Sequence, residues 1–398
     1  MRVIAYVSAR DAVPLYAVYS LLFADSGLSP AQLSSLLIIW SLTGFAFEIP
    51  SGAWADTIDR RRLLVVSGLI YACGFSLWIV WPGFAGFALG FVLWGLSSAI
   101  QSGTFEALVY DELAERGETA GYAGLIGTAN ATAMVANLSA TALAAPLYAW
   151  GGYELVGWAS VAAALGHTAL ARTLPPAARA TEVDETREAE PTGSTLLVRY
   201  RAMLSDGLAE VARRRPLRRA VVVAAAVLGM LSYDEYFPLV LREGGLATAH
   251  VALVGALIVG GQAVGAALAG RTEALSPRTI GWALAGAAIL LTAGVLTIRW
   301  GGFVAIALGY GIVNNLLVVA EARIQHQIEG RARATVTSVV GFSSEITAIS
   351  VYAFVALGGS WWSFTTIVAI LGAPSLLVAL AVGRWMPQNP RESRESPK

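Results

Sequence analysis

Long apolar stretches separated by short polar connectors run along most of the chain. The clearest stretch, residues 63–105, holds no charged residue and no histidine, and Pro82 and Gly83 near its middle are typical of a turn between two antiparallel helices. A helical membrane crossing needs about 20 apolar residues. Windows of that length, bounded by turn residues, predict twelve membrane-spanning helices at 3–23, 31–53, 63–81, 84–109, 120–149, 153–171, 220–241, 251–269, 280–298, 302–322, 335–357 and 361–383.

The pattern also predicts two halves joined by one polar segment. Residues 172–219 form the long polar stretch, so we expect an N-terminal half at 1–171, a C-terminal half at 220–385 and a cytoplasmic tail at 386–398. Part of the segment has apolar residues at helical spacing beside arginines, which predicts an amphipathic helix on the cytoplasmic face. Its apolar positions are Leu196, Leu197, Tyr200, Met203, Leu204, Leu208 and Val211. A simple tether and a binding site for a partner are both open interpretations of this segment.

Composition excludes several classes of protein. Of the 398 residues, 56% are hydrophobic and only 14% are charged, whereas a soluble domain carries about 25% charged residues. The 27 basic and 27 acidic residues cancel, so net charge does not favour a nucleic-acid partner. Cys73 has no partner for a disulfide and the three histidines lie apart, so we expect no metal site and no cofactor. The sequence lacks a phosphate-binding G-x-x-x-x-G-K-[S/T] loop and a recognisable nucleophile with its base, so we expect no enzyme.

The basic residues predict the orientation in the membrane. Arg10 lies inside the first span, Arg242 and Arg299 fall on one side, and the other basic residues lie on the side that holds both termini. The positive-inside rule places that side in the cytoplasm. The preference for arginine over lysine, together with abundant alanine, indicates a bacterial genome rich in G and C. We therefore expect a monomeric, multi-pass protein of the bacterial inner membrane, surrounded by lipid.

The loop after the second predicted span carries a motif. Residues 52–61 read G-A-W-A-D-T-I-D-R-R, which is similar to the G-x-x-x-D-R-x-G-R-R loop of the major facilitator superfamily. The matching residues are Gly52, Asp56, Arg60 and Arg61. Thr57 stands where a basic residue is usual, and Asp59 stands where a glycine is usual. The stretches F-E-I-P-S-G at 47–52 and S-G-T-F-E-A-L-V-Y-D at 102–111 look like a bacterial drug-efflux-like branch of that superfamily.

This resemblance implies an all-α integral membrane protein with twelve helices in two six-helix halves, each built of inverted repeats, that works by alternating access. It also implies a cytoplasmic latch. Asp56 would face the N-terminus of the eleventh span, whose partial positive charge favours an anion. Arg60 or Arg61 would pair with Glu106 or Asp111. The latch would hold the two halves together on the cytoplasmic side in one state and release them in the other.

Charged residues inside predicted spans cost a few kcal/mol each and need a partner, a water-filled cavity or a function. Asp11 and Glu345 are the candidates for carrying a proton, with Arg10 as the charge partner of Asp11. The alternatives are an Arg10–Asp11 pair that only fastens the first span and a Glu345 carboxyl satisfied by neighbouring groups. Asp234 and Glu235 fall near the outer end of the seventh span and are candidates for an outer gate.

The implied fold places spans 1, 4, 7 and 10 around a central cavity, with contributions from spans 5 and 8. The candidate cavity residues are Tyr16, Tyr19, Gln101, Asn130, Asn137, Gln262, Asn314 and Asn315. We expect a secondary active transporter that exchanges protons for a small drug-like or amphipathic substrate and so exports it. A proton-coupled importer of a small metabolite is the alternative, and a membrane scaffold or sensor without transport is a third interpretation.

Overall fold

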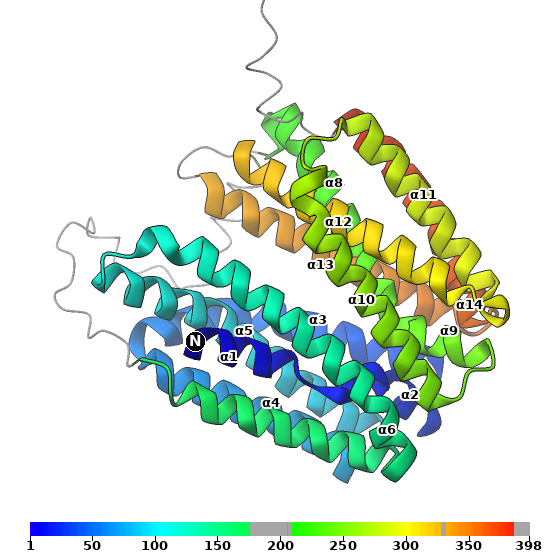
Figure 1. Cartoon of the computed structure of the whole chain (residues 1–398), viewed down its shortest axis with the longest axis horizontal. Helices are drawn as coiled ribbons and strands as arrows, with labels where there is room; N and C mark the ends of the chain where they lie inside the picture. The colour runs from blue at the N-terminus through cyan, green and yellow to red at the C-terminus, as the bar shows by residue number, and fades with distance from the viewer. Residues whose placement is uncertain (176–204, 206–208, 210, 328–331, 386–398) are drawn as a thin grey trace, which may run out of the picture. The chain divides into compact units, whose positions relative to one another are not determined.

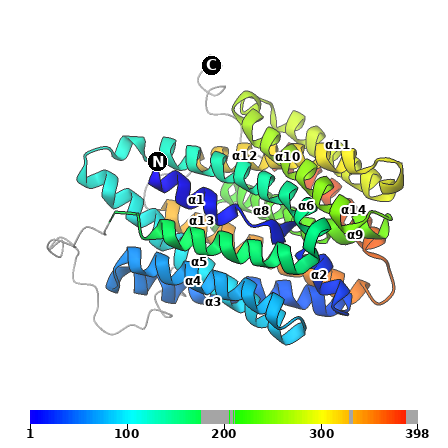
Figure 2. The ribbon, with the colours of Figure 1, turned by 60° about the horizontal axis from the view of Figure 1, so that its bottom comes forward.

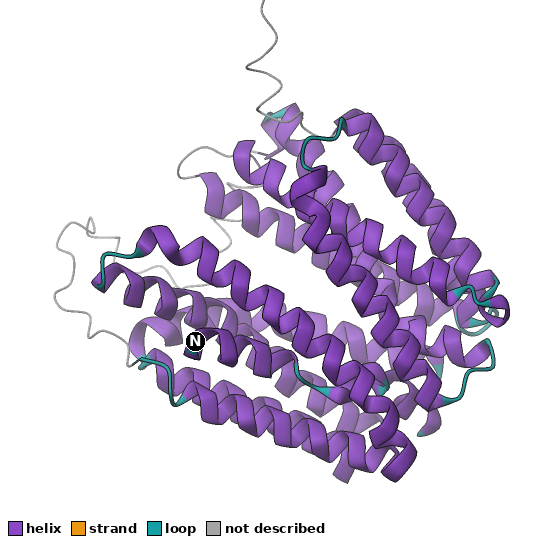
Figure 3. Ribbon diagram, in the orientation of Figure 1, coloured by secondary structure: helices purple, strands orange, loops and turns teal. Residues whose placement is uncertain are grey.

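The structure is a computed structural model, and it describes residues 1–175, 205, 209, 211–327 and 332–385. Every regular element in these residues is a helix, as Figure 3 shows, in agreement with the predicted all-α fold. The apolar positions named for the predicted amphipathic helix lie outside the described residues, except for Val211. The side chain of Val211 is buried against Val221, Ala224 and Val339.

The chain folds into two compact units (Figure 1). Unit 1 comprises Met1–Leu28 and Leu36–Arg201, and unit 2 comprises Ser29–Ser35 and Ala202–Lys398. The elements up to residue 171 are α1 (Arg2–Asp11), η1 (Pro14–Ala17), α2 (Tyr19–Asp25), α3 (Pro30–Thr57), α4 (Arg60–Val80), α5 (Phe84–Glu115), η2 (Thr119–Gly121) and α6 (Tyr122–Ala171). Those that follow are α8 (Arg215–Leu231), η3 (Ser232–Tyr236), α9 (Phe237–Glu243), α10 (Thr248–Thr272), α11 (Pro277–Leu296), η4 (Ile298–Trp300), α12 (Phe303–Gln327), α13 (Ala332–Gly358) and α14 (Phe364–Trp385).

Nine candidate membrane spans, each long and apolar enough to cross a bilayer, occur among the described residues. The predicted first span is divided into α1, η1 and α2, each too short to count by itself. The predicted fifth and sixth spans together form α6, which is not among the nine. The helices thus account for a multi-pass membrane protein, and the number twelve stays a prediction.

Helix α6 is interrupted where the sequence has two consecutive glycines. Gly151 has φ −151° and ψ 22°, and Gly152 has φ 60° and ψ −156°, whereas the segments on either side are helical. The second conformation is accessible to glycine almost alone. An unbroken helix of 50 residues would be about 75 Å long, more than twice the thickness of the hydrocarbon core. The interruption divides α6 into two segments of a length suited to a bilayer.

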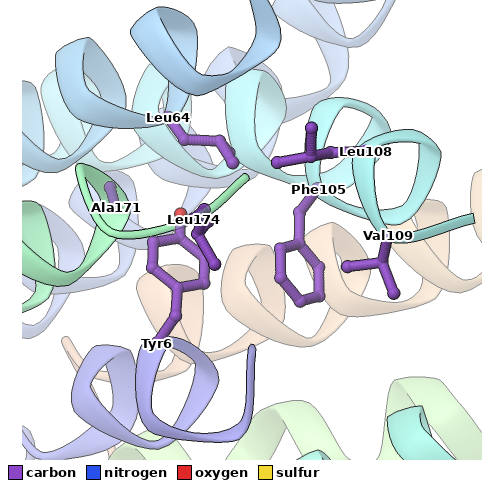
Figure 4. Close-up of a cluster of buried hydrophobic side chains, with 7 residues drawn as sticks. All are labelled: Tyr6, Leu64, Phe105, Leu108, Val109, Ala171 and Leu174. Atoms are coloured by element: carbon purple, nitrogen blue, oxygen red, sulfur yellow. The ribbon is translucent and has the colours of Figure 1, made fainter. Parts of the chain in front are cut away.

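Unit 1 has a buried cluster that ties four helices together (Figure 4). Its members come from α1, α4, α5 and the end of α6, and they are Tyr6, Leu64, Phe105, Leu108, Val109, Ala171 and Leu174. In Figure 4 the ring of Tyr6 points between the chain end of α6 and the side chains of α5. This cluster fixes the position of α1, which carries Arg10 and Asp11.

In unit 2, α10 and α12 pack backbone against backbone (Figure 2). A Cβ atom added to Gly261 would lie 2.4 Å from the carbonyl oxygen of Ala307, and one added to Gly265 would lie 2.0 Å from that of Gly311. Two glycines four residues apart let membrane helices approach closely. Asn315 completes the contact, because its Nδ2 donates to the carbonyl oxygen of Gly265 at 2.8 Å.

Candidate functional site

The first predicted span is interrupted near its middle, and the interruption carries two charged residues. Helix α1 ends at Asp11, and η1 begins at Pro14. Pro14 favours a break because its nitrogen has no hydrogen to donate within a helix. The N–H of Leu15 donates instead to Oγ of Ser160 at 2.9 Å, so a neighbouring helix replaces the lost bond. Arg10 and Asp11 therefore lie at the end of a short helix.

The guanidinium of Arg10 is held by polar groups of α4 and α5. It donates to the side-chain oxygen of Gln101 and to Oγ of Ser98 at 3.0 Å. It also lies over the ring of Tyr71, 4.8 Å from the centroid, which is a favourable position for a cation. The hydroxyl of Tyr71 in turn donates to the carbonyl oxygen of Arg10 at 3.2 Å. The site thus stabilises a positive charge within a span, next to the half-buried carboxyl group of Asp11.

These contacts fall on one face of α5. Trp94, Ser98 and Gln101 are spaced by four and three residues, so they share a helix face. Phe91 and Phe105 extend the same face in the two directions, and both are buried. Trp94, Ser98 and Gln101 between them are half-buried. The side chains at the two ends of this helix face are therefore buried, and those in the middle, beside Arg10, are partly accessible to solvent.

An aromatic cluster adjoins this opening. The ring of Trp94 stacks on Tyr16 at a centroid distance of 5.1 Å and an interplanar angle of 17°. It also contacts Trp40 of α3 at 5.1 Å. The hydroxyl of Tyr16 is hydrogen-bonded to that of Tyr71, which connects the aromatic cluster to Arg10. Tyr19, a predicted cavity residue, is instead buried within the cluster.

His167 belongs to the same region, although the sequence shows it only as an isolated histidine. It is fully buried, and its Nδ1 lies 3.0 Å from the carbonyl oxygen of Tyr6. Its ring stacks on that of Tyr6 at 4.2 Å, and Tyr6 stacks in turn on Phe105 at 5.3 Å. His167 fastens α6 to α1 at Tyr6, about one helical turn before Arg10.

The seventh predicted span has a corresponding interruption. The 3-10 helix η3 separates α8 from α9 and contains Asp234 and Glu235. Both carboxyl groups are half-buried and lie inside the candidate span Leu217–Glu243. Asp234 is hydrogen-bonded to Tyr310 of α12, and the flanking residues Tyr233 and Tyr236 are buried. Interrupted helices at matching places in two halves of a transporter point to its binding site.

The motif loop contains one of the expected ion pairs. Arg60, at the start of α4, forms a salt bridge with Asp111 of α5. Arg61 instead directs Nη1 toward the carbonyl oxygen of Leu174 at 3.5 Å. Asp59 has φ −52°, and its carboxylate accepts a hydrogen bond from the backbone N–H of Arg62 at 2.8 Å. Asp59 thus caps α4, and the turn does not need the glycine that is usual at this position, because the backbone there has negative φ.

The remaining residues of the motif lie in α3 or on the surface. Helix α3 continues to Thr57, so Gly52 and Asp56 occupy its last turns instead of a loop. The side chain of Asp56 and that of Thr335 are outside the described part of the structure. Glu106 is exposed. The predicted contact of Asp56 with the eleventh span stays a prediction.

Arg323 stabilises the matching end of unit 2. It is 1% exposed, and it donates to the carbonyl oxygens of Glu273, at 2.7 Å, and Leu275. These carbonyl groups follow the end of α10 at Thr272. In unit 1 the cation, Arg60, is the first residue of α4 and its partner, Asp111, lies in α5. In unit 2 the cation comes from α12. Sequence analysis missed Arg323 because the motif provides no counterpart for it.

The other candidates are scattered. Asn315 is bound to α10, and Asn137 accepts a hydrogen bond from Thr141 within α6 at 3.1 Å. Asn130 is exposed, whereas Gln262 and Asn314 are half-buried. Glu345 is exposed on α13. The structure therefore brings Arg10, Asp11, Tyr16 and Gln101 together within unit 1, whereas Glu345 belongs to unit 2.

Two further features of the described residues bear on where a site can lie. No group of three metal-ligating side chains occurs within the described residues. A cavity of about 360 Å³ in unit 1 is lined by Arg2, Leu108 and Arg116, among others, but not by Arg10 or Asp11. The interrupted first span with its polar and aromatic neighbours is therefore the candidate functional site.

Comparison with known protein families agrees with the resemblance that the motif loop indicates. A family profile described as Major Facilitator Superfamily matches residues 7–326. A search of curated protein sequences finds no match.

Similar solved structures cover almost the whole chain. The nucleoside transporter NupG has a TM-score of 0.72 at 11% identity, covering 96% of each chain. The D-xylose-proton symporter has a TM-score of 0.68 at 13% identity, covering 98% of this chain and 97% of its own. A bacterial homolog of the human lysosomal transporter Spinster has a TM-score of 0.66 at 17% identity, covering 97% of both chains. At these identities the likeness establishes the fold alone.

Proposed function

Because this chain belongs to the major facilitator superfamily, we propose that it is a proton-coupled antiporter that exports small amphipathic compounds across the bacterial inner membrane. Two six-helix halves would alternate in exposing one binding site to the two sides of the membrane. The resemblance of the motifs to a drug-efflux-like branch supports export. The protein has the fold of transporters that move small molecules, and its helices make it a multi-pass membrane protein.

One observation carries this proposal: a charged pair, Arg10 and Asp11, sits at a break in the middle of a span. A charge at this depth costs a few kcal/mol, and such charges in membrane helices commonly mark ion and substrate pathways. The contacts of Arg10 with Gln101, Ser98 and Tyr71 offset part of that cost for the cation. Within those contacts, Arg10 donates to neutral side chains, and its charge also acts on the neighbouring carboxyl group of Asp11.

Asp11 supplies the coupling in this scheme. A carboxylate that binds either a proton or the cationic group of a substrate, but not both, exchanges one for the other. Substrate enters from the cytoplasm when Asp11 has lost its proton, and a proton from outside displaces it after the halves have rearranged. Arg10, held in place by α4 and α5, keeps the local charge balanced when Asp11 is ionised. Asp234, beside Tyr310 in the matching break of unit 2, is the second carboxyl group that fits this role.

The test is transport by purified protein in proteoliposomes with an imposed pH gradient. A library of amphipathic amines is presented on one side, and its movement is followed with the lumen acidic or alkaline. Proton-coupled antiport predicts that the substrate moves in the direction opposite to proton flow and accumulates in the acidic compartment. A protonophore should abolish this accumulation. Accumulation in the direction of proton flow would identify an importing symporter instead.

The matched variants are Asp11→Asn, which we expect to abolish coupled transport, and Glu154→Gln, an exposed carboxyl group of α6, which should leave it unchanged. Glu345→Gln tests the exposed candidate on α13. If Asp11→Asn retains wild-type transport driven by the pH gradient, Asp11 is not the coupling residue. If no gradient drives any movement, the antiport proposal is wrong.

A further inference from the structure

The cavity of about 360 Å³ in unit 1 lies at one end of its helices. Its lining includes Arg2 at the start of α1, Glu112 near the end of α5 and Leu174 just after α6. Asp111, which forms the salt bridge of the motif loop, is the residue before Glu112. The cavity therefore lies at the end of unit 1 that the positive-inside rule predicts to be cytoplasmic.

The size of the cavity indicates an organic occupant. A volume of 360 Å³ corresponds to roughly twelve water molecules at about 30 Å³ each, which is more than a bridging water site needs. It falls at the lower end of the range of about 300–1,000 Å³ that is typical of small-molecule pockets. The cavity can therefore hold a small polar group together with a short length of hydrocarbon chain.

Most of the lining is apolar. Leu108, Val109 and Leu174 belong both to this lining and to the buried cluster of Figure 4, so the cavity adjoins well-packed side chains. The other apolar lining residues are Val3, Leu113 and Leu125, besides Met1 and Pro175. Each methylene group that leaves water for such a surface tightens binding about fourfold. The lining thus favours a hydrocarbon chain.

The charged part of the lining favours an anion. Arg2 is exposed and donates to the carbonyl oxygen of Thr173 at 3.2 Å. The side chain of Arg116 is 61% exposed and forms a salt bridge with Glu112. A guanidinium group has five N–H donors, and each of these two makes one hydrogen bond with the described residues. Two cations and one carboxylate leave the lining with an excess positive charge.

The two arginines lie at the depth of the lipid headgroups. Helix α1 begins at Arg2 and α5 ends at Glu115, directly before Arg116, so both guanidinium groups lie where a span leaves the hydrocarbon core. Basic pockets between membrane helices on the cytoplasmic side bind anionic headgroups. The chain continues from Pro175, but residues 176–195 contain Val183 as their only apolar side chain apart from alanines and prolines. That segment therefore does not supply the hydrocarbon that the lining favours.

We propose that this cavity binds an anionic phospholipid of the cytoplasmic leaflet. Its phosphate group accepts hydrogen bonds from Arg2 and Arg116, and the first part of one acyl chain lies against the apolar lining. The site is separate from Arg10 and Asp11, and the inference does not depend on the proposed transport function. A lipid bound here joins the start of α1, the helix that carries the charged pair, to the end of α5.

The experiment separates headgroup charge from chain burial. Calorimetry measures the binding of dioctanoyl phosphatidylglycerol to the purified full-length protein in a neutral detergent. Dioctanoyl phosphatidylcholine has the same chains without net charge, and glycerol 3-phosphate has the phosphate without chains. We expect phosphatidylglycerol to saturate one site, phosphatidylcholine to bind about fivefold more weakly, and glycerol 3-phosphate to bind at least tenfold more weakly. Equal affinities of the two lipids, or of phosphatidylglycerol and glycerol 3-phosphate, would overturn the proposal.

Variants locate the site. Arg2→Gln and Arg116→Gln should each weaken phosphatidylglycerol binding about fivefold. Arg172→Gln is the matched control, because Arg172 is exposed two residues before Leu174 but does not line the cavity, and it should change the affinity less than twofold. Leu125→Trp places a larger side chain in the cavity and should weaken both lipids. Equal weakening by all three arginine variants would indicate general attraction to a basic surface and contradict the proposal.

Two controls keep the result decisive. Leu125→Trp has a risk of misfolding, which size-exclusion chromatography detects, whereas the exposed arginines can be replaced without disturbing the core. The chain's own linker is the other candidate occupant, because residues 182–190 include five acidic residues. If phosphatidylglycerol binds only after these five are changed to their amides, the linker occupies the cavity and the lipid proposal is wrong. Lipid binding without gradient-driven transport would support this inference and refute the antiport function.

Discussion

Replacement of Gly152 by alanine tests the division of α6 into two segments. Gly152 has φ 60° and ψ −156°, and an added Cβ atom would meet no other atom within 4 Å. The cost of Gly152→Ala is therefore conformational and not steric. A residue held in a region that only glycine populates loses about 1–3 kcal/mol. We expect the free energy of unfolding to fall by that amount.

The same helix provides a control of opposite sign. Gly166 lies in the second segment of α6, and an added Cβ atom there also meets no atom within 4 Å. Alanine at a helical glycine stabilises by roughly 0.5–1 kcal/mol. Gly166→Ala should therefore raise stability while Gly152→Ala lowers it, which separates the two variants by roughly 1.5–4 kcal/mol.

The measurement is equilibrium unfolding of the purified protein in mixed micelles with increasing dodecyl sulfate, followed by circular dichroism. Equal stabilities of Gly152→Ala and the wild type would show that residue 152 is not in the glycine-only region. The helix could then continue through this point, and the separation of the predicted fifth and sixth spans would lose its structural basis.

Two further predictions concern the ends of the units that the positive-inside rule predicts to be cytoplasmic. The carboxyl group of Asp111 is 48% exposed and the guanidinium of Arg60 is 22% exposed, so Asp111→Asn should lower the free energy of unfolding by only about 0.2–1 kcal/mol. If Asp111 is a latch residue, the same substitution should nevertheless slow transport in proteoliposomes several-fold. A double variant with the two charges exchanged that transports no better than Asp111→Asn would argue against the latch. Arg323→Leu leaves two carbonyl groups without their cationic donor and should lower the free energy of unfolding by about 2–3 kcal/mol. Arg323→Lys should recover part of that stability. A loss below roughly 0.5 kcal/mol in Arg323→Leu would contradict the capping role.

The sequence predicted the membrane helices well, because each crossing needs a long apolar run that few other structures require. The matched family confirms the predicted superfamily. The ends were less accurate. Helix α3 continues to Thr57 and α5 to Glu115, since helices of this kind extend beyond the apolar window into polar residues. The length of an apolar run determines where a span can lie. The residue at which the helix begins or ends depends instead on local capping groups such as Asp59.

The site was only partly predictable. Arg10 and Asp11 were predicted as candidates because they are charged residues within an apolar run. The spacing that puts Trp94, Ser98 and Gln101 on one helix face is also present in the sequence. Which residues face Arg10 depends on how α1, α4 and α5 pack, and that contact is tertiary. The exposure of Glu345 was not predictable for the same reason, because depth along a span does not determine which side of the helix a residue occupies.

The contact between α10 and α12 limits how unit 2 can move. Gly261, Gly265 and Gly311 have no side chains to adopt a second arrangement, so the two backbones have one way of fitting together. Sliding by a single residue would drive a Cβ atom into a carbonyl oxygen. Helices α10 and α12 should thus move together as one rigid body during any rearrangement. A chemical crosslink between α10 and α12 should therefore leave the transport rate unchanged.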